Sequence, residues 1–462
     1  MASFLKKLTG APRKAARSIS VGTSSTAREL KSSRSASPAS SSSKSAAAAS
    51  SSDEQPMSVN QRPYYHGMLS REDCHTMLRK PGDFLLRVTD VNRQRTLVVT
   101  VRGRTSGINH FLVHRGEDGH VSITPEHTFS AVEDMIDYFL AVGTPLTANG
   151  DVKLQNPVHR PPWQLRHDQV ILKEQIGSGS FGEVHKGILL SDEGRYQICA
   201  VKTLIKNMLF TKSDRVDFMR EARLLRQHAH KNIIQFYGVA IEDDPMMIVM
   251  EYANQGSLLE HLRNHPELTN VERSQLLTEA AQGMRVLEKA ECIHRDLAAR
   301  NCLLTDGVLK IADFGLSVEA TLQVENDPRV VFPTRWTAPE VFLSHQFSTK
   351  SDVWAFGIVM WEVFSGGCAP YAGMSNEQVR TAVMEHTARL EAPRGMPAKH
   401  AALMQRCLNP MANVRPTFLD VKLKLRKLTA KLTPGDERPP APADAKAANA
   451  PPKKVTHYSE ID

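Results

Sequence analysis

The segment HRDLAARN, residues 294–301, constrains this chain more than any other stretch. It places a carboxylate, Asp296, and an amide, Asn301, five positions apart, with the cation Arg300 directly before the amide. A carboxylate can accept a proton from a reacting group, and carboxylate and amide oxygens are ligands for hard metal ions. Both tasks require the two side chains to face one small volume. The segment therefore predicts a loop of fixed shape at a reaction site.

A glycine-rich segment, IGSGSFGEV, lies between two predicted strands and carries Gly177, Gly179 and Gly182. Glycine allows the backbone to approach phosphate oxygens because no Cβ stands in the way. On its own, the pattern also fits a flexible hairpin or a dinucleotide-binding turn. The dinucleotide-binding turn requires a following helix, whereas a strand-like segment follows here.

Further motifs follow in a fixed order. Lys202 ends the strand-like segment CAVK, Glu221 lies on a predicted helix, and HRDLAARN is followed by ADFG at 312–315 and APE at 338–340. This ordered set is the signature of the protein kinases. Each motif could arise by chance, but their joint occurrence at kinase spacing could not. Residues 168–430 therefore resemble a protein kinase domain.

The resemblance implies transfer of the γ-phosphate of ATP, which depends on positioning and charge neutralisation. Lys202, held by an ion pair to Glu221, is expected to bind the α- and β-phosphates. Asn301 and Asp313 are expected to ligate Mg²⁺ or Mn²⁺, and Asp296 to accept the proton of the attacking hydroxyl. The expected nucleotide site comprises Gly177, Ser178, Gly179, Ser180, Phe181, Gly182, Val184, Ala200, Lys202, Glu221, the gatekeeper Met250 and the hinge residues Glu251 and Ala253.

Arg300 distinguishes among kinase classes. The run DLAARN resembles the tyrosine kinases, whereas serine/threonine kinases usually carry a lysine at the position of Ala298. The segment FPTRWTAPE, with Pro333 and Trp336, also resembles the tyrosine-kinase form. The alternatives are that Arg300 is a solvated charge, that the enzyme modifies serine or threonine, or that the kinase fold is an inactive adaptor. The retained Lys202, Asp296, Asn301 and Asp313 disfavour the inactive adaptor.

An earlier segment, YYHGMLSREDCHTMLRKPGDFLLRVTD, resembles the start of an SH2 domain. Arg87 lies within an apolar strand-like run, where a cation is costly to bury unless an anion meets it. Its planar guanidinium suits a phosphate group. The resemblance implies that Arg87 binds phosphotyrosine together with Arg71, Thr89 and His110. The alternative is a structural ion pair or a side chain that reaches solvent.

An SH2 domain directly before a tyrosine kinase, without an SH3 domain, resembles the Fes/Fer family of non-receptor tyrosine kinases. The junction PPWQLRHDQVILKEQIGSGSFGEVHKG matches that family closely. Full-type members also carry an F-BAR domain, which the first 58 residues cannot form, so the chain resembles a short form.

The expected fold class is α+β. It comprises an SH2 domain with an antiparallel sheet flanked by two helices, followed by a bilobal kinase fold. Composition sets the expected boundaries: a disordered Ser/Ala-rich tail at 1–58, SH2 at 59–155, a proline-rich linker at 156–169, kinase at 170–430, and a disordered Pro/Ala-rich tail at 431–462.

Charge and cysteine content limit the partners. The net charge is +8, and the first 52 residues hold nine Lys/Arg against one acid, so the remainder balances at zero. A basic tail of this kind argues against a nucleic-acid-binding face on the folded domains.

The six scattered cysteines include no CxxC pair, which favours a reducing, cytoplasmic location without disulfides or zinc. We interpret the tail as a solvated segment. One alternative is peripheral contact with anionic lipids at the inner face of the plasma membrane. The other is a transit peptide. The partners expected are tyrosine-phosphorylated proteins and protein substrates.

The activation segment contains no tyrosine between Asp313 and Glu340. The common switch, in which a phosphotyrosine orders this segment, is therefore not expected. We hypothesise that SH2 docking or a pre-ordered segment sets activity, with Glu319, Glu325 and Asp327 supplying negative charge. Tyr458 in the C-terminal tail is either an inert residue or a site that, once phosphorylated, binds Arg87 or recruits partners.

Overall fold

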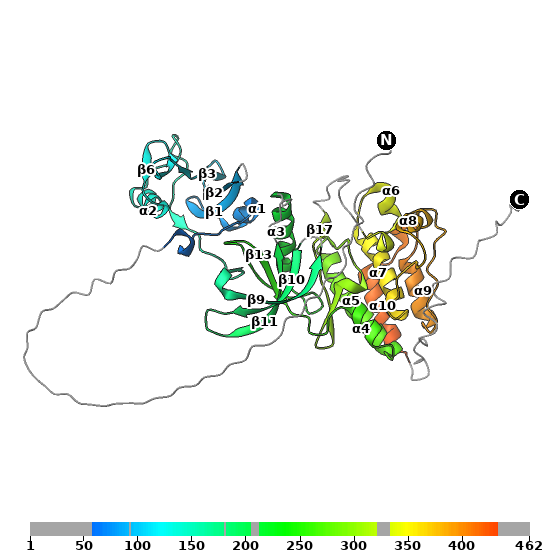
Figure 1. Ribbon diagram of the computed structural model, residues 1–462. Helices are drawn as coiled ribbons and strands as arrows, with labels where there is room; N and C mark the ends of the chain where they lie inside the picture. The colour runs from blue at the N-terminus through cyan, green and yellow to red at the C-terminus, as the bar shows by residue number, and fades with distance from the viewer. Residues whose placement is uncertain (1–57, 92–93, 180–181, 205–211, 321–332, 433–462) are drawn as a thin grey trace, which may run out of the picture. The chain divides into compact units, whose positions relative to one another are not determined.

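The structure is a computed structural model that describes residues 58–91, 94–179, 182–204, 212–320 and 333–432 (Figure 1). Ser180 and Phe181, expected at the nucleotide, lie outside the described residues, as do Glu325, Asp327, Tyr458 and the basic tail. Within the described residues the fold class is α+β, with the elements expected of an SH2 domain followed by a two-lobed kinase domain.

The first domain has a four-stranded sheet in the order β3-β2-β1-β7, with α1 and α2 on opposite sides (Figure 1). Its core joins the sheet to α2 through Phe84, Val99, Ile136 and Phe139. The elements are α1 (Arg71–Met77), β1 (Asp83–Val91), β2 (Gln94–Arg102), β3 (Ile108–Leu112), α2 (Val132–Val142), β7 (Asn156–Pro157) and a small sheet of β4 (His114–Arg115), β5 (Val121–Thr124) and β6 (His127–Phe129). These elements match the SH2 expectation.

The strand-rich lobe of the kinase has a six-stranded sheet in the order β8-β12-β13-β11-β10-β9. One long helix, α3 (Lys212–Gln227), packs against it. The strands are β8 (Gln164–Leu165), β9 (Val170–Gly179), β10 (Gly182–Leu190), β11 (Tyr196–Leu204), β12 (Phe236–Ala240) and β13 (Met246–Glu251). A strand does follow the glycine-rich turn, which excludes the dinucleotide-binding alternative.

The second lobe is built mainly of helices around α7 (Thr349–Phe364), which is buried from Ser351 to Phe364. The others are α4 (Leu258–Asn264), α5 (Asn270–Lys289), α6 (Pro339–Ser344), α8 (Asn376–Met384), α9 (Ala398–Cys407) and α10 (Phe418–Thr429). Two small antiparallel sheets pair β14 (Cys292–Ile293) with β17 (Val318–Glu319), and β15 (Cys302–Thr305) with β16 (Val308–Ile311). The HRDLAARN segment lies between β14 and β15.

The segment predicted as a linker is not a free spacer. Asn156 and Pro157 form β7 and pair with β1, and the Val158 N–H donates to the Phe84 carbonyl at 2.8 Å. A few residues later, β8 pairs with β12 of the kinase sheet. Prolines lack an N–H donor, so a Pro-rich segment is confined to sheet edges; both short strands lie at an edge. The chain from 156 to 165 is therefore part of both domains.

The SH2 domain and the kinase share one apolar cluster. Met68, Leu69 and Leu78 from the SH2 domain pack in the same cluster as Met219 of α3 and Ile241. The Met68 N–H donates to the Ile241 carbonyl at 2.7 Å. Gly67, at φ +56°, allows this approach because a Cβ there would lie 2.2 Å from the Ile241 oxygen.

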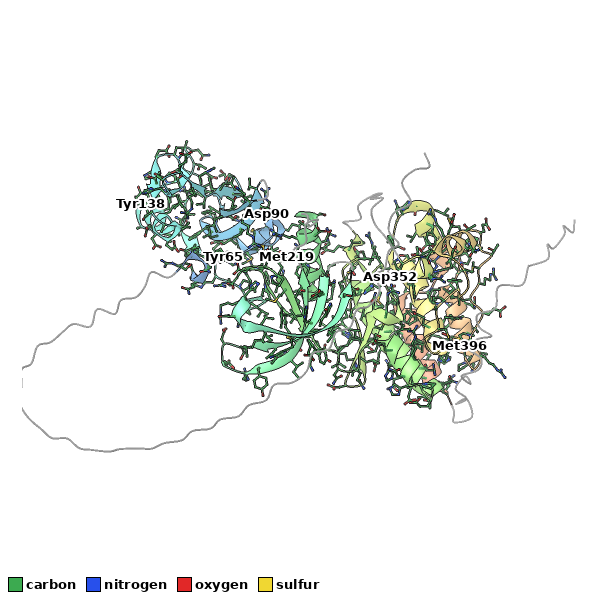
Figure 2. All side chains as sticks on the ribbon, in the orientation of Figure 1. Tyr65, Asp90, Tyr138, Met219, Asp352 and Met396 are labelled. Carbon is green, nitrogen blue, oxygen red and sulfur yellow. The ribbon has the colours of Figure 1, made fainter. Side chains whose placement is uncertain are left out.

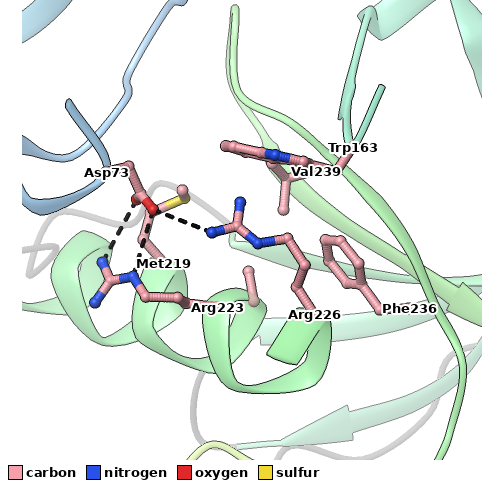
Figure 3. Close-up of a pocket in the computed structure, with 8 residues that line it drawn as sticks. Asp73, Trp163, Met219, Arg223, Arg226, Phe236 and Val239 are labelled. Atoms are coloured by element: carbon pink, nitrogen blue, oxygen red, sulfur yellow. Dashed lines mark hydrogen bonds and ion pairs between the residues drawn. The ribbon is translucent and has the colours of Figure 1, made fainter. Parts of the chain in front are cut away.

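Charged groups from α3 meet the SH2 domain beside this cluster (Figure 3). Asp73, almost fully buried in α1, lies 3.4 Å from Arg223 and 3.7 Å from Arg226. The Arg226 guanidinium lies over the Trp163 ring, 4.1 Å from its centroid. The SH2 domain therefore contacts the helix that also carries Glu221.

Candidate active site

The register of three strands assembles one wall of the expected nucleotide site. Val184 pairs with Lys202, which pairs with Ile248, and Ala200 pairs with Met250. Side chains at alternate positions of a strand share a face. Val184, Ala200, Lys202 and Met250, each predicted from sequence, therefore lie on one face of the sheet. The hinge residues Glu251 and Ala253 continue the chain directly beyond Met250.

The end of the glycine-rich turn depends on one glycine in particular. Gly182 has φ +145°, and a Cβ there would lie 1.9 Å from the Thr203 carbonyl oxygen. Any side chain at this position would push β10 away from β11, the strand that carries Lys202. Of the three motif glycines, this one is required by packing as well as by the expected phosphate contact.

Lys202 is held as the sequence predicted. Its Nζ lies 2.7 and 2.8 Å from the two Glu221 carboxylate oxygens, and 3.5 Å from Asp313 Oδ1. Burial would lower the pKa of Lys202, but the negative charges of Glu221 and Asp313 outweigh it and raise that pKa. The ammonium therefore stays charged in a buried position, as a phosphate-binding cation must.

The catalytic loop is braced from the buried helix α7. Asp352 accepts hydrogen bonds from the backbone N–H groups of His294 at 2.8 Å and Arg295 at 3.0 Å. Figure 2 shows Asp352 at the side of the helical lobe that adjoins the strand-rich lobe. Arg295 has φ +67°, a conformation that costs free energy outside glycine and is maintained by these bonds.

His294 links the loop to the ADFG segment. Its Nε2 lies 3.1 Å from the Ala312 carbonyl, which can only accept, so Nε2 carries the proton. Its Nδ1 then accepts from the Asp296 N–H at 3.3 Å. Burial lowers the pKa of His294 to about 4, which keeps the ring neutral and suited to these two roles.

Asp296 and Asn301 are joined as the opening motif requires. The Asn301 side-chain amide donates to the Asp296 carbonyl at 2.7 Å, which fixes the loop across five residues. Burial raises the pKa of the Asp296 carboxyl, and the neighbouring Arg300 and Asn301 oppose that rise. A raised pKa makes the carboxylate a better proton acceptor than an exposed aspartate.

Arg300 is not a solvated charge. Its Nη2 forms an ion pair with Asp296 Oδ1, and its guanidinium lies 4.4 Å from the centroid of the Trp336 ring. The Trp336 indole N–H donates to Glu362 Oε2 at 3.0 Å, and the same oxygen accepts from the Ala299 N–H. Sequence reasoning missed Glu362. Its signal was an acid inside the apolar run VMWEVF, because a buried carboxylate requires donors.

The donor set suits a hard divalent cation. Asn301 donates through its nitrogen, which leaves its carbonyl oxygen as the ligating atom, and Asp313 lies beside Lys202 at φ +62°. Among the described residues, no three His, Cys, Asp or Glu side chains gather as a metal cage. Mg²⁺ is commonly held by one or two protein groups together with substrate phosphates, so the pair fits that ion.

A second ion pair anchors the end of the activation segment. Arg415, fully buried, donates to both Glu340 oxygens at 2.7 and 2.8 Å, and lies over the Trp354 ring. The pair ties the APE motif to the segment that precedes α10.

The SH2 domain contains a separate basic site. Arg87 is 2% exposed, and its Nε donates to Thr100 Oγ1 at 3.1 Å. That hydroxyl also lies 3.1 Å from His110 Nδ1. Sequence reasoning missed Thr100, although the register of β1 and β3 against β2 places it beside both residues. Thr89 shares the strand face of Arg87, two positions on.

The electrostatics of this site favour an anion. Burial, together with the positive charges of Arg87, Arg71 and His75, lowers the pKa of His110 to about 4. Arg71 stands at the first position of α1. Three of the four predicted residues, Arg71, Arg87 and His110, thus interact electrostatically, and Thr89 lies on the same face of β1 as Arg87.

Comparisons with known proteins identify both domains. The model of the protein tyrosine and serine/threonine kinase family matches residues 170–425, and the SH2 domain model matches 64–139. Fer-related kinase 1 of Caenorhabditis elegans is 35% identical over 374 residues, which cover 80% of this chain and 94% of that protein.

Two further relatives cover similar shares of the chain. The transforming protein Fps of avian sarcoma virus (strain PRCII) is 37% identical over 362 residues, which cover 78% of this chain and 66% of that protein. Human tyrosine-protein kinase Fer is 35% identical over 387 residues, which cover 82% of this chain. The chain spans 46% of the human protein's length.

Proposed function

Since the chain belongs to the SH2-containing protein tyrosine kinases of the Fer and Fps type, we propose that Lys202, Asp296, Asn301 and Asp313 perform its phosphoryl transfer. The enzyme transfers the γ-phosphate of ATP to protein tyrosines and uses a divalent metal ion. We assign Lys202 to the α- and β-phosphates, with Glu221 as its positioning residue. Asn301 and Asp313 are the residues that would hold the metal, which we propose is Mg²⁺.

Bound there, the metal would neutralise charge on the phosphates. Asp296 accepts the phenolic proton, because its carboxylate is buried and its pKa is raised. Arg300 orients that carboxylate through the ion pair while its stacking on Trp336 fixes its own position. We infer that this cation and aromatic ring together set the preference for a phenol.

The observation that carries the proposal is the convergence of Lys202 with Glu221 and Asp313, beside a loop that holds Asp296 and Asn301 together. The test uses the full chain, Mg²⁺–ATP and peptides that differ only in a tyrosine, serine or threonine acceptor. We expect phosphotyrosine alone from the wild type and none from Asp296→Asn. Equal turnover by that variant would refute the assignment of the base.

We further propose that Arg71, Arg87, Thr89 and His110 bind the phosphate of phosphotyrosine, with Thr100 orienting Arg87. The SH2 domain binds tyrosine-phosphorylated proteins, and the buried guanidinium of Arg87 is the group that suits a phosphate.

The contacts of the SH2 domain with α3 give a route for regulation, because Asp73 forms an ion pair with Arg223 on the helix that carries Glu221. SH2 docking thereby stabilises the position of Glu221 without an activation-segment tyrosine.

For the basic N-terminal tail we propose peripheral contact with anionic lipid, and for the chain a cytoplasmic location at the inner face of the plasma membrane. The support is the excess of nine Lys/Arg over one acid in the first 52 residues. Within the described residues, no helix has the length and apolar character to cross a membrane. We expect sedimentation with phosphatidylserine vesicles that weakens several-fold from 50 to 300 mM salt; equal sedimentation with neutral vesicles would contradict the proposal.

A further inference from the structure

The tyrosines of this kinase differ sharply in exposure. Seven of them lie in the described residues, and six are buried or half-buried. Tyr196 is the exception among the seven, with 75% of its surface exposed. A tyrosine kinase needs a phenol that can leave its own fold and enter an active site, so Tyr196 is the described tyrosine that meets this condition.

The surroundings of Tyr196 are also accessible. Residues 191–198 are all exposed, and the run ends at the buried Cys199. Tyr196 begins β11 and pairs with Leu190, the last pair of the β10–β11 hairpin. Before it, the Ser191 N–H donates to the Arg195 carbonyl at 2.8 Å, and Gly194 at φ +75° completes a tight turn. Such a hairpin tip can separate from the sheet locally while the core remains folded.

The position of Tyr196 along β11 determines which active site it can enter. It lies six residues before Lys202 on the same strand. At about 3.3 Å per residue, the two Cα atoms are separated by about 20 Å of strand. Lys202 is anchored in the catalytic site by Glu221, and β11 is paired with β10 from Tyr196 on and with β13 as well from Cys199 on. Tyr196 therefore cannot enter the site of its own chain unless the sheet opens.

We propose that Tyr196 is an autophosphorylation site, modified in trans by a second copy of this chain. The proposal rests on the catalytic function described above. The phenolic oxygen of Tyr196 bonds to the γ-phosphorus of ATP as the bond from that phosphorus to the β–γ bridging oxygen breaks. ADP leaves with that electron pair, and the phenolic proton passes to Asp296 of the acting copy.

The modification gives this chain a site of self-phosphorylation outside its activation segment, which carries no tyrosine. A phosphate adds about 1.5 to 2 negative charges beside Asp192 and Glu193, whose side chains are 75% and 70% exposed. Since Asp192 pairs with Arg166 and Glu193 pairs with Arg195, the added charge competes for these two arginines at the hairpin tip.

The test mixes unlabelled wild-type chain with a ¹⁵N-labelled, full-length Lys202→Met acceptor, Mg²⁺–ATP and a tyrosine peptide substrate. Mass spectrometry separates phosphate on the acceptor from phosphate on the enzyme. We expect phosphate on Tyr196 of the labelled chain, and no phosphate at that position with a Tyr196→Phe acceptor. A Tyr252→Phe acceptor, changed at a half-buried tyrosine, should be modified at Tyr196 as before. Circular dichroism confirms that each acceptor is folded.

A dilution series separates the two routes. On the wild-type chain incubated alone, the fraction of Tyr196 phosphorylated per minute rises about tenfold with a tenfold rise in concentration if transfer is in trans, and does not change if it is in cis. Phosphorylated peptide without phosphate on Tyr196, or a rate independent of concentration, would overturn this inference and leave the proposed catalytic site intact. Loss of peptide phosphorylation as well would overturn both.

Discussion

At the scale of single residues, two opposing effects determine the pKa of Asp296, the proposed proton acceptor. Burial raises the pKa of Asp296, and the positive charge of Arg300 holds that rise in check. The carboxylate must be ionised to accept a proton, so activity is lost as the pH falls through this pKa. The acidic limb of the rate profile should therefore lie above the ordinary aspartate pKa of about 3.9.

Replacement of Arg300 tests this balance. In Arg300→Gln the opposing charge is removed, so the pKa of Asp296 rises and the acidic limb of kcat/KM moves to higher pH. We expect a shift of about one pH unit, because one nearby cation commonly lowers a carboxyl pKa by 1–3 units. Arg389→Gln, at an exposed arginine on the loop after α8, should leave the profile in place. An unmoved limb in Arg300→Gln would contradict the role of the ion pair.

Replacement of Arg87 tests the proposed phosphotyrosine site of the SH2 domain. In Arg87→Lys the planar fork is replaced by a point charge, so phosphotyrosine-peptide affinity should fall by tenfold or more. Thr100→Val, which removes only the hydroxyl that orients Arg87, should lower affinity by a smaller factor. Isothermal titration calorimetry measures both. Wild-type affinity in Arg87→Lys would place the anion elsewhere.

At the scale of elements, α3 belongs to two sites at once. It presents Glu221 to Lys202 and presents Arg223 to Asp73 of the SH2 domain. The sequence predicted the first contact from kinase spacing. It could not predict the second, because residues 150 positions apart in sequence carry no pattern that pairs them.

Removal of Asp73 should therefore lower catalysis from a distance. In Asp73→Ala the buried acceptor between Arg223 and Arg226 is lost, and two cations remain close together. We expect a several-fold fall in kcat/KM without phosphopeptide present. Glu117→Gln, on an exposed SH2 turn, is the matched control. Full activity of Asp73→Ala in a folded chain would exclude regulation through this contact.

The ion pair between Arg415 and Glu340 of α6 predicts a loss of thermal stability when Arg415 is replaced. In Arg415→Met the Glu340 carboxylate loses both of its charged donors, while the apolar packing on Trp354 is partly retained. Loss of one partner of a buried ion pair costs about 3 kcal/mol. We expect a melting temperature several degrees lower. A change below one degree would show that the pair contributes little.

At the scale of the whole molecule, the sequence predicted the residues of both sites better than it predicted what joins the domains. Local motifs specified Lys202, Asp296 and Arg87, because their chemistry requires fixed residue types in fixed order. The strand pairing of 156–158 and the shared apolar cluster depend on contacts between distant segments. For that reason the pairing of the predicted linker with strands of both sheets was not foreseen from the sequence.

The shared cluster predicts joint unfolding. Since Met68 and Leu69 of the SH2 domain pack in the same cluster as α3, the two domains should unfold in one calorimetric transition. Asp73→Ala should lower that transition. The contact would not couple the domains if they unfolded in two transitions far apart in temperature and Asp73→Ala shifted neither of them.

The most direct test of the catalytic site is a crystal structure of the full chain with a non-hydrolysable ATP analogue and Mg²⁺. We predict that the Lys202 ammonium contacts the α- and β-phosphates while Asn301 and Asp313 ligate the metal beside the Asp296 carboxylate. A metal ion bound away from Asn301 and Asp313, or a triphosphate out of reach of Lys202, would contradict the assignment.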